Sequence, residues 1–158
     1  MTSATLTPGH TAERLCELST EVRAAVLLDA AGALAAFHGV PKGDSRRLAE
    51  LARQLFESVD RAHRDLPGGP PEQVEVQIDG GAVFASRTPR WTLAAVARRT
   101  ALSSLTLMDL RAVLAELEEG RPIRRSTAAG EKGASGPASE EAAAGESPIP
   151  ELGPEREG

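Results

Sequence analysis

Cysteine and aromatic residues are almost missing from this sequence of 158 residues. It has one cysteine, one tryptophan, three phenylalanines and no tyrosine. A single cysteine, Cys16, excludes an intrachain disulfide and any metal cluster built from several cysteines. Scarce aromatics, a net charge of −5 and a pI near 5.3 argue against a nucleic-acid-binding protein, which needs positive charge to neutralise phosphates.

Long apolar runs are also lacking. No strictly apolar run is longer than that at residues 24–28, which is far too short to cross a bilayer. Residues 1–20 contain no apolar core of a signal peptide. We therefore expect a cytoplasmic protein that does not insert into membranes.

Motifs for catalysis or ligand binding are absent as well. The histidines, which have no Cys, Asp or Glu at metal-ligand spacing, are His10, His38 and His63. The glycine pairs at 68–69 and 80–81 lack the lysine of a phosphate-binding loop, and no nucleophile-elbow motif occurs. Asp29 is interpreted as a turn residue and not as an acid or base. The sequence predicts no enzyme, no metal or other cofactor, and no small-molecule substrate.

Composition divides the chain into three parts. Residues 121–158 hold seven Ala, seven Glu, six Gly, five Pro and four Ser, and few side chains that could form a core. Such a segment cannot offset the entropy cost of ordering it, so we predict a disordered tail. Within it, SPIPELGPE at 147–155 has the form of a docking peptide, although a passive tail is the more usual explanation. Residues 1–9 are predicted to be a flexible lead, and residues 10–120 a single domain.

Hydrophobic periodicity gives the expected elements of that domain. Helices are predicted at 11–20, at about 44–66 with Asp44 or Ser45 as the cap, and at 105–119 after a cap at Ser103 or Ser104. Strands are predicted at 22–29, 33–38, 72–79, 82–87 and 91–99. Gly80-Gly81 is expected to form a hairpin turn, and Gly120 to end the last helix. The order favours the α+β class, with one five-stranded antiparallel sheet covered by helices.

Two features of this pattern favour self-association. The middle helix has an apolar stripe wider than one packed face needs, and the strand at 72–79 alternates apolar and polar residues as an edge strand does. Two copies could pair edge to edge across a two-fold axis. The residues predicted for this interface are Leu51, Leu55, Phe56, Val59, Val74, Val76 and Ile78. The alternative is that both features pack inside one chain.

The other side of the middle helix is charged. Its arginines, which we consider as partner-facing residues, are Arg46, Arg53, Arg61 and Arg64. The spacing also predicts ion pairs from Glu57 to Arg61 and from Asp60 to Arg64. A solvated face is the more common explanation of such a charge run, and no single arginine stands out as an arginine finger.

The segment VRAAVLLDAAGALAAFHGV, followed by a long helix, resembles the roadblock, or dynein light chain, family. The resemblance continues through VEVQIDGGAVFASRTPRWTLAAVARR and LTLMDLRAVLAELE, and covers residues 10–120. ALSSL at 101–105 departs from the family because it lacks the glycine that many relatives place before the last helix.

The resemblance implies a roadblock (profilin-like) fold, with two helices on one face of the five-stranded sheet and one long helix on the other. It implies dimers formed through residues 44–66 and 72–79. Bacterial and archaeal roadblock proteins commonly regulate Ras-like small GTPases as activators or scaffolds, so the resemblance implies a non-enzymatic homodimeric regulator of such a GTPase. Alternatives are a dimeric scaffold for signalling or cytoskeletal proteins without a GTPase partner and, from another class, a small-ligand sensor.

Overall fold

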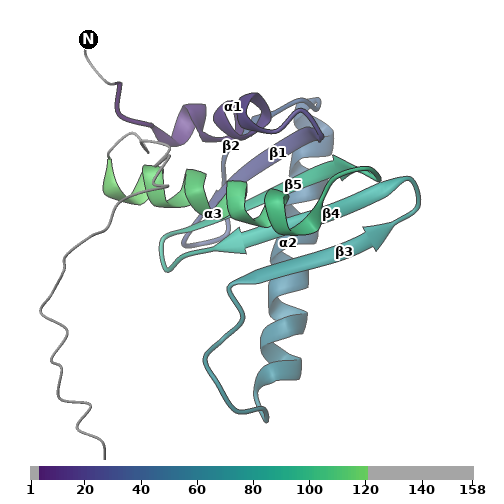
Figure 1. Ribbon diagram of the computed structural model, residues 1–158. Coiled ribbons are helices and arrows are strands. Elements are labelled where there is room, and N and C mark those ends of the chain that lie inside the picture. The colour runs from purple at the N-terminus through teal and green to yellow at the C-terminus, as the bar shows by residue number, and fades with distance from the viewer. Residues whose placement is uncertain (1–3, 121–158) are drawn as a thin grey trace, which may run out of the picture. The chain divides into compact units, whose positions relative to one another are not determined.

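A computed structural model describes residues 4–120 of the chain (Figure 1). The predicted tail at 121–158, with its docking-peptide motif, lies outside the described residues. In chain order the helices and strands are α1 (Pro8–Leu18), β1 (Val22–Asp29), β2 (Leu34–His38), α2 (Lys42–His63), β3 (Gln73–Ile78), β4 (Gly81–Arg87), β5 (Trp91–Arg98) and α3 (Ser103–Glu119).

The five strands form one antiparallel sheet in the order β2-β1-β5-β4-β3. Figure 1 shows α1 and α3 on one face of this sheet and α2 on the other. This confirms the predicted α+β class and the arrangement of two helices opposite one long helix. It also places β3 at an edge, as its alternating pattern indicated, with β2 at the other edge.

β1 shows why the sheet needs helices on both faces. Its side chains alternate, so that Ala25 and Leu27 enter the core under α1 and α3, whereas Val26 and Leu28 enter the core under α2. All four are buried. A strand covered on both faces needs apolar residues at every position, which explains its continuous apolar run.

The helices begin differently from the prediction. α1 begins at Pro8, ahead of the predicted residue 11, because proline suits a first helical position where no N–H bond is needed. α2 begins at Lys42 after Pro41, and no side chain caps it. Ser45, a predicted cap, is instead buried inside the helix and its hydroxyl donates to the Lys42 carbonyl oxygen at 2.7 Å.

The last helix also begins without a side-chain cap, since it follows Leu102 and includes both predicted cap serines. Its end is as predicted, because Gly120 adopts the left-handed conformation with φ +59°. The glycine pair between β3 and β4 divides into two roles. Gly80, with φ +82°, lies in the turn, whereas Gly81 is the first residue of β4 and is buried.

Candidate interaction surface

The apolar residues of α2 fall into two groups that serve different purposes. One group faces the sheet and is buried together with the polar Ser45: Leu48, Ala49, Ala52 and Phe56. A second row, four residues apart, lies on the flank of the helix and consists of Leu51, Leu55 and Val59. Leu51 is 39% exposed, and the other two are half-buried. The wide stripe is therefore a core face plus an apolar flank that residues 4–120 cover only in part.

Apolar residues of β3 lie on the same face of the sheet as α2. Val76 is opposite Val83, and Val83 is buried in the core beneath the helix. Residues opposite each other in an antiparallel pair share a face, and residues two apart on one strand do too. Val74, Val76 and Ile78 therefore point to the α2 side, where Ile78 is 45% exposed. We call the residues Leu51, Leu55, Val59, Val74, Val76 and Ile78 the α2–β3 surface.

The opposite face of β3 is fixed by hydrogen bonds to α3. The Gln73 side chain donates to the Leu107 carbonyl oxygen at 2.9 Å, and the Ser103 hydroxyl donates to Glu75 at 2.7 Å. β3 pairs with β4 alone, so alternate N–H and C=O groups along its outer side have no strand partner within residues 4–120. The edge is thus held in position and open to a further strand.

Arg87 links the end of α2 to the start of β3. Its guanidinium donates two hydrogen bonds to Asp60 of α2, at 2.8 and 2.5 Å, and one to the Pro71 carbonyl oxygen at 3.0 Å. It also lies 4.4 Å from the centre of the Phe56 ring. One side chain from β4 therefore sets the position of α2 and of the segment that leads into β3, the two parts of the α2–β3 surface.

Ion pairs shift the pKa values of two carboxyl groups on α2. Hydrogen bonding from Arg87 holds the pKa of Asp60 below its ordinary value. Hydrogen bonds from Arg53 and Gln54 lower the pKa of Glu50. Burial raises the pKa of the Cys16 thiol, which is half-buried against the α1 side of the core. The pKa shift of Glu50 thus arises from the charged face of α2 itself, and that of Asp60 from the ion pair between α2 and β4.

The structure corrects one residue of the predicted interface. Phe56 is only 5% exposed and packs in the core between α2 and the sheet. It is a core residue of the single chain. The other six predicted residues form the α2–β3 surface, and their role in self-association stays a prediction.

The four arginines considered as partner-facing do not act as one surface. Arg53 pairs with Glu50 and Glu57 on its own helix. Arg46 lies in the first turns of α2 beside β2, at the other end of the helix from the exposed Arg61 and Arg64. The predicted pairs from Glu57 to Arg61 and from Asp60 to Arg64 are wrong, because these acids pair with Arg53 and Arg87 instead.

Arg87 is the residue supporting this surface that the sequence did not single out. Its partner Asp60 lies 27 residues away on another element, and no local spacing rule reports such a pair. Among residues 4–120 no group of three or more His, Cys, Asp or Glu side chains could hold a metal ion. None of the described helices is long and apolar enough to cross a membrane.

Comparison with known proteins gives a family and a fold. The model of the Roadblock/LC7 domain matches residues 11–97, more than half of the chain. Of the solved structures, the Roadblock/LC7 domain from Streptomyces avermitilis has a TM-score of 0.64 and 24% identity, over 69% of this chain and 92% of that one. Myxococcus xanthus MglB has a TM-score of 0.62 and 14% identity, over 71% and 92%. The gliding protein MglB from Thermus thermophilus has a TM-score of 0.57 and 19% identity, over 75% and 95%. No curated protein matches the sequence. Because these sequence identities are low, the structural similarity establishes the fold alone.

Proposed function

Because the chain belongs to the roadblock/LC7 family, we propose that it is a non-enzymatic, homodimeric adaptor that regulates a Ras-like small GTPase. The family supports the GTPase as partner, since bacterial roadblock proteins commonly regulate such enzymes. Two of the similar structures are MglB proteins, which share the fold. The observation that carries the self-association is the α2–β3 surface, which combines a partly exposed apolar flank of α2 with an edge strand that has no outer strand partner among residues 4–120.

A two-fold axis at the β3 edge would satisfy both parts of this surface together. Two β3 strands that pair across the axis would join the two sheets into one, which removes both open edges. The α2 flanks of the two chains lie on the same face, so they would meet over the joined strands. The pairing would cover Leu51 and Ile78, the two most exposed apolar residues of the surface.

An adaptor that supplies no catalytic group regulates by preferring one conformation of its partner. A ligand shifts an equilibrium only as far as its affinities for the two states differ. The proposal therefore requires that the dimer bind the GTP-loaded and the GDP-loaded GTPase with different affinities. Faster hydrolysis or altered nucleotide exchange then follows from the favoured conformation of the GTPase itself.

Light scattering and titration calorimetry together test the proposal. The protein alone should scatter as a dimer, and a Ras-like GTPase from the same genome should bind it when loaded with one nucleotide and much more weakly with the other. Leu51→Glu with Ile78→Glu should give a folded monomer. Leu102→Glu is the matched control, because Leu102 is 68% exposed but lies outside the α2–β3 surface.

The two halves of the proposal can fail separately. A wild-type monomer would overturn the adaptor geometry. A dimer that binds no such GTPase in either nucleotide state would overturn the GTPase assignment and favour the alternative, a scaffold for other proteins.

A further inference from the structure

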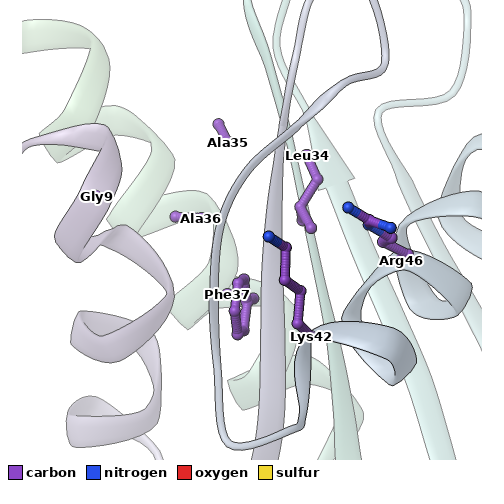
Figure 2. A pocket seen from close by; sticks show the side chains of 7 residues that line it. All are labelled: Gly9, Leu34, Ala35, Ala36, Phe37, Lys42 and Arg46. Carbon is purple, nitrogen blue, oxygen red and sulfur yellow. The ribbon is translucent and has the colours of Figure 1, made fainter.

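An open groove of about 500 Å³ follows the free edge of β2, at the far side of the sheet from β3 (Figure 2). Residues 34–37 of β2 line it along the strand. The first turn of α1 contributes Gly9 on one side, and α2 contributes Lys42 and Arg46 on the other. Figure 2 shows the two cationic side chains beside Leu34, with the Phe37 ring next to Lys42.

The strand in this groove has the features of an edge that accepts another strand. β2 pairs with β1 alone, so alternate backbone N–H and C=O groups face the groove without a strand partner in the described chain. Protein edges are usually protected by proline, by charge, by bulges or by covering elements. Residues 34–37 carry neither proline nor charge; the β1–β2 register shifts between Leu27 and Leu28, and α1 packs against one side of β2, so the groove is the part of this edge that stays open. The side chains of Ala35 and Ala36 are small, which lets a second backbone come close.

Charge and an apolar side chain give the groove its chemical preference. Neither Lys42 nor Arg46 has an ion-pair partner among residues 4–120. The neighbouring acids are already engaged: Asp44 pairs with Arg47, and the Asp29 carboxylate accepts the N–H groups of residues 31 and 33. Phe37 is 40% exposed, so it offers an apolar contact at the same edge.

We propose that the β2 edge binds an extended acidic peptide of a partner protein by β-strand addition. The peptide backbone pairs with β2, its carboxylates meet Lys42 and Arg46, and one large apolar side chain packs on Phe37. Backbone hydrogen bonds supply affinity that is independent of sequence, whereas the two cations and the ring select the peptide. Since β2 and β3 are opposite edges, a dimer joined at β3 would keep two such grooves free.

A second copy of this chain is a poorer occupant of the groove. Pairing β2 with β2 across a two-fold axis would bring two Lys42 and Arg46 pairs to the same junction. Like charges brought close together repel each other, which disfavours this pairing. A partner with carboxylates at this position removes that repulsion and replaces it with attraction.

Fluorescence anisotropy with a labelled synthetic peptide tests the proposal on the full-length protein. The probe is a short peptide in which Glu alternates with Val and Leu, and its counterpart has Lys in place of Glu. The acidic probe should bind and the basic probe should not. The double variant Lys42→Glu with Arg46→Glu should weaken binding about tenfold, because two attractions become repulsions.

Matched controls separate the groove from net charge. Arg61→Glu with Arg64→Glu makes the same change of charge on the same helix, outside the groove, and should leave the affinity nearly unchanged. N-methylation of alternate residues of the probe removes backbone donors and should abolish binding in one of the two registers. Circular dichroism melts confirm that all variants fold, as expected for exposed positions.

Three outcomes would overturn the proposal. The first is equal affinity of the two charge-reversed variants, and the second is insensitivity to N-methylation in both registers. The third is a change of oligomeric state in the Lys42 and Arg46 variant, which would assign the edge to a second copy of the chain. Dimerisation through β3 is measured independently, so a failure here is distinct from a failure of the proposed function.

Discussion

At the scale of single residues, Arg87 makes three kinds of contact that the sequence pattern did not predict. It contacts a carboxylate, a carbonyl oxygen and an aromatic ring, and its own side chain is 21% exposed. Charge-assisted bonds with two parallel donors are stronger than ordinary surface ion pairs. Arg87 therefore stabilises the fold more than the exposed pairs elsewhere on the helices.

Replacing Arg87 with Ala should lower the free energy of unfolding by about 1–2 kcal/mol, because Asp60 and the Pro71 carbonyl oxygen lose their donor. Urea denaturation measures the loss. Arg90→Ala is the matched control: Arg90 is 67% exposed and its pair with Glu118 is long, at 3.4 Å, so its loss should be close to zero. Equal losses in the two variants would show that the contacts of Arg87 add nothing.

The same pair predicts how stability depends on pH. The folded pKa of Asp60 lies below its ordinary value of 3.8 because of the hydrogen bonds from Arg87. A lowered folded pKa gives stability that is present above the unfolded pKa and is lost as the pH falls through the folded pKa. The stability difference between the parent and Arg87→Gln should therefore be full at about pH 7 and shrink below about pH 4.

Urea denaturation of both proteins across this range is the measurement. The Asp60 side chain is 46% exposed, so added salt should reduce the difference as well. A difference that stays constant between neutral and acid pH would contradict the assignment of the ion pair.

The adjacent glycines Gly80 and Gly81 at the β3–β4 turn differ in how much space a side chain would have. A Cβ atom on Gly81 would lie 2.4 Å from the Ala97 carbonyl oxygen on β5, whereas one on Gly80 would meet nothing within 4 Å. Gly81→Ala should therefore cost about 2 kcal/mol or more, because neighbouring strands must move apart. Gly80→Ala should cost about 1 kcal/mol for its positive φ alone.

Gly43→Ala is the control for this pair. Gly43 lies in the first turn of α2 with open space around its Cα, so alanine should stabilise the helix by about 0.5 kcal/mol. Thermal unfolding of the three variants should give the order Gly43→Ala, Gly80→Ala, Gly81→Ala from most to least stable. A reversed order of the last two would mean that β4 and β5 are not closely paired.

At the scale of elements, α2 shows what periodicity can and cannot predict. The helix, its apolar stripe and the edge position of β3 were all predictable, because helical and strand periods are written in the local sequence. The boundary between core and surface within the stripe was not. It depends on how far the sheet extends beneath the helix, so Phe56 could not be told from Leu55 by spacing. The caps failed for a similar reason, since Ser45 satisfies its hydroxyl inside the helix.

Two substitutions on α2 should separate its core face from its flank. Phe56→Ala should lower the free energy of unfolding by about 3–5 kcal/mol, because it opens a cavity beneath the helix. Leu51→Ala should cost far less in unfolding but should weaken the dimer, since its side chain is 39% exposed in the single chain. Chemical denaturation and light scattering over a dilution series report the two effects separately. A Leu51 variant that dimerises like the parent would remove Leu51 from the interface.

At the scale of the whole molecule, the sheet has two edges with different chemistry. β3 offers an apolar face and is fixed by side-chain hydrogen bonds to α3, whereas β2 offers an exposed ring beside two cations of α2 that have no ion-pair partner among residues 4–120. Identical edges would favour open chains of molecules, because each copy could add another at either side. Different edges allow one to close a dimer while the other stays available for an acidic partner.

Residues 4–120 contain the contacts that hold both described cores together. Within residues 4–120 both faces of the sheet are covered, and α3 ends at a left-handed glycine. All the residues of both described cores lie before Gly120. A protein shortened to residues 1–120 should therefore unfold at nearly the same temperature as the full chain and keep the same oligomeric state. Thermal melts with light scattering measure both. A shortened protein that melts much earlier would place part of the stabilising contacts in residues 121–158, and one that no longer dimerises would move the interface away from α2 and β3.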